Sequence, residues 1–178
     1  MTVFKKIFKP LDVNESMEGW LLHSHKGRDR HDQSARYFEN KNNLLGIPTI
    51  VLSAITGTTI FASLATQDKM LIWVKIIVGF LSVSAAVLAS LQTFYNYHER
   101  AEKHRSTGVK YKEIIRSIEK TTLSRDFSQE EIDNIYNRLN EIEENAPVVP
   151  DVIFSKIESQ YQQVIFVEKA DQLYESKK

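Results

Sequence analysis

Residues 62–72 read ASLATQDKMLI, a short polar stretch between two long apolar runs. The run before it contains no charged residue from Asn42 to Gln67, and the run after it contains none from Ile76 to His98. The 178-residue chain is otherwise rich in charge, with 23 Lys and Arg balanced by 23 Asp and Glu. Since the net charge is zero, any electrostatic attraction to a partner must come from local clusters.

Each apolar run is long enough to cross a bilayer. Residues 44–65 would form a helix of about 33 Å, which matches a hydrocarbon core of about 30 Å. The second span, 70–94, carries Lys75 in its first turn, where a lysine can extend to the headgroups. The alternative, two buried helices of a soluble bundle, requires a small chain to hide segments that are apolar on nearly every side. We therefore predict an all-α membrane protein with an antiparallel two-helix transmembrane hairpin.

Basic residues lie on one side of this hairpin. They precede the first span and follow the second at Lys26, Arg28, Arg30, Arg36, Lys41, Arg100, Lys103, Arg105, Lys110 and Lys112. The connector offers only Lys69 and Lys75. The positive-inside rule then places both termini in the cytoplasm. The predicted divisions are a cytoplasmic N-terminal segment (1–41) with a basic, His-rich helix, the hairpin (42–98) and a helical cytoplasmic region (99–178).

Small and polar residues share one side of the second span. At 100° per residue this side contains Lys75, Gly79, Ser82, Ala86, Ala89, Ser90, Thr93 and Asn96. The first span has a weaker stripe of Thr49, Ser53, Thr56 and Ser63, bordered by Gly57. Such residues let membrane helices pack closely. They would equally line a water-filled path if several hairpins assembled, and both interpretations remain open.

The cytoplasmic parts are predicted to be helical. The second span has no stop signal, so its helix is expected to continue to about Ser106 and on towards Lys120. An apolar stripe follows at Tyr111, Ile114, Ile115 and Ile118. Ser128 and Glu131 form a capping-box pattern before a helix whose inward face is Ile132, Ile135, Tyr136, Leu139 and Ile142. A last helix is expected from Val152 to about Tyr174, although residues 163–167 would also suit a short strand.

The densest polar cluster, HSHKGRDRHDQSAR (23–36), resembles no complete catalytic or metal-binding motif. Gly27 stands where a metallohydrolase pattern needs aspartate, and the chain has no Gly-rich phosphate loop, GxSxG motif or cysteine. We predict no enzyme, metal or cofactor. The cluster is interpreted either as a solvated helix face near anionic lipid or as a site for an anionic ligand. The candidate ligand-binding residues are His23, Lys26, Arg28, Arg30, Arg36, Arg100, Lys103, His104 and Arg105.

A family resemblance rests on Tyr37, Asn40-Lys41 and three longer segments. These are LLGIPTIVLSAITG (44–57), LSVSAAVLASLQTFYNYHERAEKH (81–104) and VKYKEIIRSIE (109–119). They resemble the SLATT domain, a family of two-helix membrane effectors associated with SMODS nucleotidyltransferases and SLOG nucleotide sensors.

The resemblance implies a pore-forming effector of bacterial anti-phage defence in the inner membrane. Because a two-helix hairpin cannot enclose a pore alone, a pore requires a homo-oligomer, with four copies as the working number. A nucleotide or oligonucleotide that bridges the basic residues flanking both spans would open or close it. Its action would depolarise the membrane and arrest growth or kill the cell. A cognate nucleotidyltransferase is an expected partner, and the alternative is a non-conducting anchor or scaffold for a cytoplasmic partner.

Overall fold

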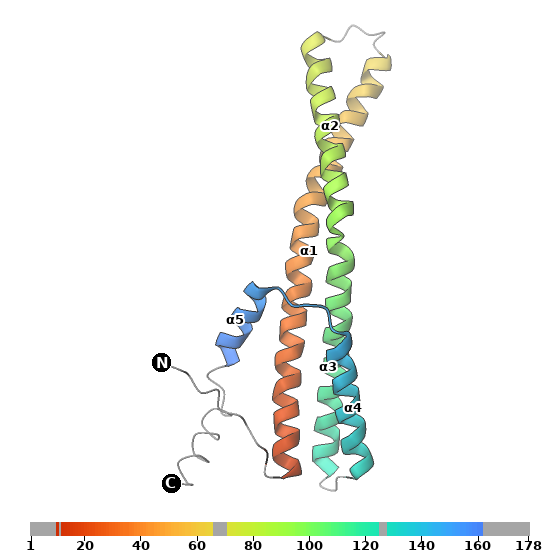
Figure 1. Ribbon diagram of the computed structural model, residues 1–178. Helices are drawn as coiled ribbons and strands as arrows, with labels where there is room; N and C mark the ends of the chain where they lie inside the picture. The colour runs from red at the N-terminus through yellow and green to blue at the C-terminus, as the bar shows by residue number, and fades with distance from the viewer. Residues whose placement is uncertain (1–9, 11, 66–70, 125–127, 162–178) are drawn as a thin grey trace, which may run out of the picture. The chain divides into compact units, whose positions relative to one another are not determined.

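A computed structural model describes residues 10, 12–65, 71–124 and 128–161, and this part of the chain is helical throughout its regular elements. The helices are α1 (Val13–Ala65), α2 (Ile72–Tyr95), α3 (Tyr97–Ser124), α4 (Gln129–Asn145) and α5 (Asp151–Tyr161) (Figure 1). The predicted all-helical character is confirmed for these residues. The expected extension of the last helix beyond residue 161, and the possible strand at 163–167, lie outside the described part.

The helix expected to run unbroken through the second span is interrupted at Asn96. This residue has φ 45° and ψ 47°, a left-handed conformation that separates α2 from α3. Its backbone N–H donates to the Gln92 carbonyl (3.1 Å), and its side chain donates to the Glu99 carboxylate. Asparagine tolerates this conformation better than most residues. The prediction of a continuous helix was therefore wrong at one residue, which hydrophobic periodicity does not reveal.

The chain divides into two compact units, which are described separately. One unit combines the chain up to Ala35 with the chain from Lys103 onward. Its core contains Met17 of α1, Tyr111, Ile114 and Ile118 of α3, and Ile135, Leu139 and Ile142 of α4. The predicted apolar stripes of α3 and α4 meet here, although Tyr136 stays half-exposed and contacts Trp20 with ring centroids 5.8 Å apart. Burial of these faces holds three helices side by side (Figure 1).

Two local features position the helices of this unit. A Cβ atom at Gly27 would lie 2.6 Å from Cζ of Tyr111, so the absence of a side chain lets α1 approach the tyrosine ring. At the start of α4, the Ser128 hydroxyl accepts from the Glu131 N–H (3.2 Å), and the Glu131 carboxylate accepts from the Ser128 N–H (3.3 Å). The predicted capping box is thereby confirmed, and it satisfies two donors at the helix start.

The second unit, Arg36–Glu102, contains the apolar part of α1, all of α2 and the first turn of α3. The residues of α2 that are buried or half-buried are Val74, Val78, Leu81, Ser84, Ala85, Leu88 and Gln92. Apart from Ser84 they alternate at spacings of four and three, the pattern of a coiled-coil seam. The Gln92 amide lies 3.4 Å from Oδ1 of Asn42, and a Cβ at Gly46 would lie 3.1 Å from Gln92 Nε2. A narrow seam of α2 therefore packs on α1.

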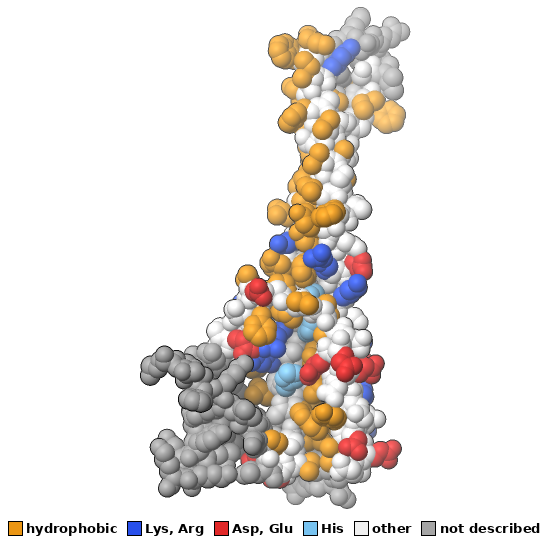
Figure 2. All heavy atoms as spheres, viewed as in Figure 1, with side chains coloured by type: hydrophobic (Ala, Val, Ile, Leu, Met, Phe, Trp, Pro, Cys, Tyr) orange, Lys and Arg blue, Asp and Glu red, His pale blue; other side chains and the backbone are white. Residues whose placement is uncertain are grey.

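Both apolar helices are long enough to cross a membrane, and little of either is buried. In the most apolar 18-residue stretch of each helix, only 11% of α1 and 6% of α2 is buried within the chain. Large apolar side chains are exposed along both helices instead (Figure 2). Exposure of this extent is typical of lipid-facing helices and is not that of a soluble core.

Candidate functional site

Helix α2 presents three different faces. The seam described above contacts α1, and a second face carries exposed bulky residues, including Trp73, Phe80 and Val87. The third face is the small and polar stripe. Its members are all exposed: Lys75, Gly79, Ser82, Ala86, Ala89, Ser90, Thr93 and Asn96. The stripe therefore lies largely outside the contact with α1 and is available to another surface.

A groove of about 400 Å³ runs along the border between the stripe and the seam. Its walls are Ser53, Thr56, Gly57 and Ile60 of α1 and Ser82, Ala85, Ala86 and Ala89 of α2. Most of these side chains are small, so a bulky side chain from outside would find room here. Thr56 is only 7% exposed, and its hydroxyl has no hydrogen-bond partner within the described residues. The groove thus combines free space with an unsatisfied polar atom.

The other hydroxyl groups of these helices bond mainly to their own backbone. Thr49 donates to the Leu45 carbonyl (2.7 Å), Ser90 to the Ala86 carbonyl (2.8 Å) and Thr93 to the Ala89 carbonyl (3.1 Å). Such bonds satisfy the hydroxyl hydrogen inside an apolar environment. Of the predicted stripe on α1, Thr49, Thr56 and Ser63 are buried or half-buried, whereas Ser53 is exposed.

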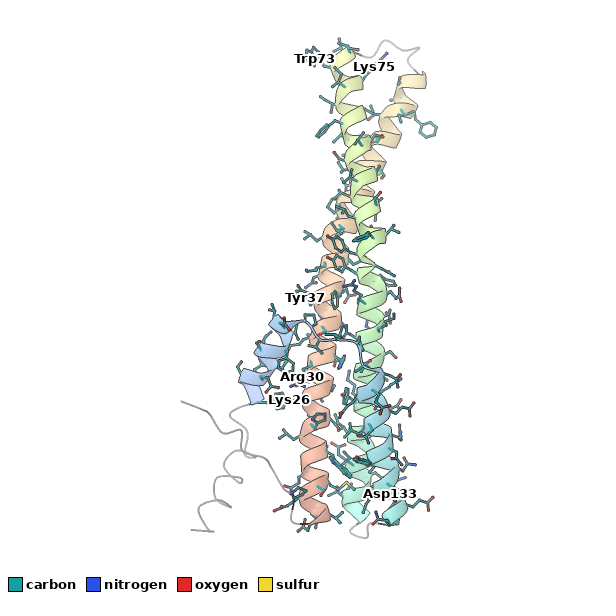
Figure 3. The ribbon with its side chains drawn as sticks, viewed as in Figure 1. Lys26, Arg30, Tyr37, Trp73, Lys75 and Asp133 are labelled. Atoms are coloured by element: carbon teal, nitrogen blue, oxygen red, sulfur yellow. The ribbon has the colours of Figure 1, made fainter. Side chains whose placement is uncertain are left out.

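Aromatic residues bracket the apolar part of α2. Trp73, near its start, lies at the same end of the helix as Lys75 (Figure 3). Tyr95, at its end, stacks on Tyr97 with ring centroids 5.2 Å apart. A helix rises about 33 Å between these two positions, which matches the hydrocarbon thickness of a bilayer. Tryptophan and tyrosine favour the two membrane interfaces. The pair was overlooked at the sequence level, although its spacing is readable there.

The predicted anionic-ligand residues that α1 contributes to the first unit already form ion pairs. His23 contacts Glu143 (2.8 Å), Lys26 contacts Glu158 (2.6 Å), and Arg30 also binds Glu158. Arg28 binds the neighbouring Asp29, with Nε and an NH2 group 2.8 and 2.7 Å from the same carboxylate oxygen. Figure 3 shows Lys26 and Arg30 on the part of α1 beside α5. Lys26 and Arg30 are thus brought together, and the carboxylate between them comes from α5.

The remaining candidates occupy different environments. Lys103 and Arg105 are exposed on α3. In the second unit Arg36 is exposed, and the Arg100 guanidinium lies 5.9 Å from the centroid of the Phe38 ring. His104 is almost fully buried. A buried imidazole is not positioned to bind a soluble anion, which separates His104 from the other members of the predicted set.

His104 instead pairs with His31. Their Nδ1 atoms are 2.9 Å apart, and the His31 ring stacks on Tyr111 with centroids 5.8 Å apart. Burial, followed by the proximity of His104 and Arg30, lowers the pKa of His31 to about 4 despite the opposing charge of Asp32. Burial lowers the pKa of His104 to about 4 as well. Both rings are therefore neutral at pH 7, with one Nδ1–H donating to the other Nδ1. Sequence reasoning missed this pair because its members are far apart in the chain.

Comparison with protein families matches residues 13–162 to the SMODS and SLOG-associating 2TM effector domain family 4. The chain belongs to this family. The match covers all five helices together with the connector, and it confirms the resemblance seen in the sequence. Comparisons with curated proteins and with solved structures find no match.

Membership of this 2TM effector family identifies the chain as a membrane effector. The family is described by its two transmembrane helices and its association with SMODS and SLOG proteins, and not by a reaction. Within the described residues, no three His, Cys, Asp or Glu side chains form a group able to hold a metal ion. This 2TM effector therefore has two candidate functional surfaces. One is the exposed α2 stripe with its groove, and the other is the basic cluster of α1, which consists of His23, Lys26, Arg28 and Arg30.

Proposed function

We propose that this 2TM effector forms an oligomeric ion-conducting pore in the bacterial inner membrane as part of anti-phage defence. Its apolar helices cross the membrane as an antiparallel hairpin with both termini in the cytoplasm. A nucleotide-type or oligonucleotide signal, made by a cognate nucleotidyltransferase, gates the pore from the cytoplasm. Conduction depolarises the membrane and causes growth arrest or cell death.

The observation that carries this proposal is the exposure of the small and polar stripe on α2. A stripe that served only to pack α2 on α1 would be buried between them, and the seam already supplies that contact. Polar and small side chains are unfavourable towards lipid compared with the bulky face of Trp73, Phe80 and Val87. The stripe is therefore best accommodated against another copy or around a water-filled path.

Two helices do not enclose a conduit, so conduction requires several copies. The groove beside the stripe offers small residues at close spacing and the unsatisfied Thr56 hydroxyl. Small residues permit close approach of membrane helices, and hydroxyl groups can bond across the contact. A contact of this kind between unlike faces must close on itself to form a ring. Four copies serve as the working number.

The second candidate function is a non-conducting anchor or scaffold for a cytoplasmic partner. It is favoured by the extent of the unit formed by α3, α4, α5 and the start of α1, which offers ample polar surface for a protein partner. In that case the stripe would only join copies of the anchor. The two candidates differ in whether the membrane becomes permeable to ions.

Ser82→Leu tests the pore directly. Ser82 is exposed on the stripe, and a leucine there would place a bulky apolar group in the conduit. We expect loss of toxicity and of membrane depolarisation on expression, with unchanged membrane insertion. Val87→Leu on the bulky face is the matched control and should leave both effects intact.

Purified protein in liposomes and crosslinking in membranes complete the test. Ion flux should appear with the wild-type chain and disappear with Ser82→Leu, while crosslinking yields closed oligomers. A protein that remains monomeric in membranes, or that passes no ions with or without extracts containing the signal, would favour the scaffold.

A further inference from the structure

Three side chains of α5 contact the part of α1 that carries the basic cluster. The Glu158 carboxylate binds both Lys26 and Arg30. The Tyr161 hydroxyl donates to Oδ2 of Asp29 (2.6 Å), and the Arg30 guanidinium lies 4.4 Å from the centroid of the Phe154 ring. Two apolar residues of α5, Ile153 and Ile157, are buried, which adds an apolar contribution to the docking.

Two donor groups, one from Lys26 and one from Arg30, share a single oxygen atom of Glu158. Lys26 Nζ and an Arg30 NH2 group both bind the same oxygen, Oε1. The remaining Arg30 donor on this side, Nε, is buried and has no partner within the described residues. An arginine fork normally engages a carboxylate or phosphate through two parallel hydrogen bonds. Glu158 therefore partly balances the positive charge of Lys26 and Arg30, but it leaves the Nε donor of Arg30 without an acceptor among the described residues.

Glu158 occupies the site as an anion. Burial opposes ionisation of its carboxyl group, but the hydrogen bonds and charges of Lys26 and Arg30 outweigh that effect and lower its pKa. At neutral pH this internal anion consequently competes with any external anion for the same two basic residues.

We propose that Lys26 and Arg30 form a phosphate-binding site, which Glu158 of α5 occupies in this structure, and that a bound phosphoryl group releases α5. A phosphoryl group presents three acceptor oxygens to Lys26 Nζ and to both the NH2 and Nε donors of Arg30. It also carries more negative charge than a carboxylate. The exchange is competitive, because both anions need the same donors.

This site gives the signal of the proposed function a defined place to act. Displacement of Glu158 removes the ion pairs that hold α5 and leaves the Tyr161–Asp29 hydrogen bond and the apolar contacts. A terminal nucleotide phosphate and a lipid phosphodiester both present phosphate oxygens to these donors, although the diester has only two unesterified oxygens and a single charge. The experiment must therefore separate these two sources. Only the role in signalling rests on the proposed function, and binding itself is measurable without any ion flux.

The test uses the full chain in phosphatidylcholine nanodiscs, with pyrophosphate as the soluble probe. Binding is measured by calorimetry, and docking of α5 by hydrogen exchange of its backbone amides. We expect pyrophosphate to bind and to speed exchange in α5 while exchange in α4 stays unchanged. Glu158→Gln should speed α5 exchange without ligand and tighten pyrophosphate binding about tenfold or more, because the internal competitor is lost.

Two further variants and a lipid arm complete the design. Arg30→Gln should abolish pyrophosphate binding, and Glu144→Gln, which removes the same charge from α4, should change neither measurement. Nanodiscs containing phosphatidylglycerol, without pyrophosphate, should speed α5 exchange if lipid is the natural source, and should leave it slow if the source is soluble. In either case the phosphate site stands.

Two results would overturn the proposal. One is equal pyrophosphate affinity in wild type and Glu158→Gln, and the other is hydrogen exchange in α5 that stays unchanged when pyrophosphate binds. If Glu158→Gln merely loosens α5 and no variant binds pyrophosphate, the contact is structural and the proposal also fails. A protein that shows the exchange but conducts no ions would contradict the pore and leave this site intact.

Discussion

His31 and His104 lie 73 residues apart in the chain and meet through nitrogen atoms 2.9 Å apart. The two rings share one hydrogen bond when both are neutral. If both rings were protonated to imidazolium, both Nδ1 atoms would carry a hydrogen, and the two N–H groups would repel each other. Around them lie Tyr111, whose pKa is raised to about 12 mainly by burial, and the charged neighbours Arg30 and Asp32. No local pattern in the sequence indicates such a pair. It depends on α1 and α3 packing side by side.

The histidine pair predicts loss of stability in mild acid. Unfolded histidine has a pKa of about 6.5, whereas both folded side chains titrate at about 4. Stability from the pair is therefore complete above pH 6.5 and declines as the pH falls towards 4, because the unfolded chain then binds more protons. The decline is at most about 1.4 kcal/mol per pH unit for each histidine.

Thermal unfolding in detergent, followed by circular dichroism between pH 7.5 and 4.5, measures this decline. His104→Gln should flatten the pH dependence, whereas His98→Gln, at an exposed position, should preserve it. An unchanged slope in His104→Gln would show that other groups cause the acid sensitivity.

At the scale of elements, neighbouring alanines of α2 belong to different faces. Ala85 is 7% exposed in the seam with α1, and Ala86 is exposed on the stripe. Ala85→Leu should overpack the seam and lower the free energy of unfolding by about 1–3 kcal/mol. Ala86→Leu should leave that stability unchanged and abolish toxicity. Thermal unfolding in detergent and a growth assay separate the two effects, and equal destabilisation by both substitutions would contradict the assignment of faces.

Several elements followed from the sequence because their signals are local. The Ser128–Glu131 cap, the buried stripe of α3 and most of the inward face of α4 were predicted from spacing alone. The left-handed Asn96 was not, because a single residue that leaves the helix disturbs no periodicity. The docking of α5 was not predicted either, since Glu158 meets Lys26 and Arg30 through contacts distant in the chain.

At the scale of the whole molecule, the sequence predicted the family from its motifs. The absence of charge predicted two segments long and apolar enough to cross a membrane. The sequence also predicted which residues of α2 form the stripe, but left open whether the stripe packs on α1. The stripe is exposed beside the seam that packs on α1, and its role as a helix-packing face or as a pore lining stays a prediction. The basic cluster was predicted to be either a solvated helix face near anionic lipid or a site for an anionic ligand, and both stay predictions. The carboxylate of Glu158 that binds Lys26 and Arg30 could not be placed there without the fold.

The backbone bonds of Ser90 and Thr93 bear on which ions the proposed pore would pass. Each hydroxyl donates its only hydrogen to a carbonyl of its own helix, so the oxygen offers only lone pairs outward. Oxygen lone pairs coordinate cations and repel anions. A ring of Lys75 side chains at the other end of the stripe would favour anions instead. We therefore predict that Lys75→Gln moves the reversal potential in a KCl gradient to near the potassium equilibrium value, because the cation preference of Ser90 and Thr93 is then unopposed. Thr93→Val should weaken this preference, and a reversal potential near the chloride value in Lys75→Gln would contradict it.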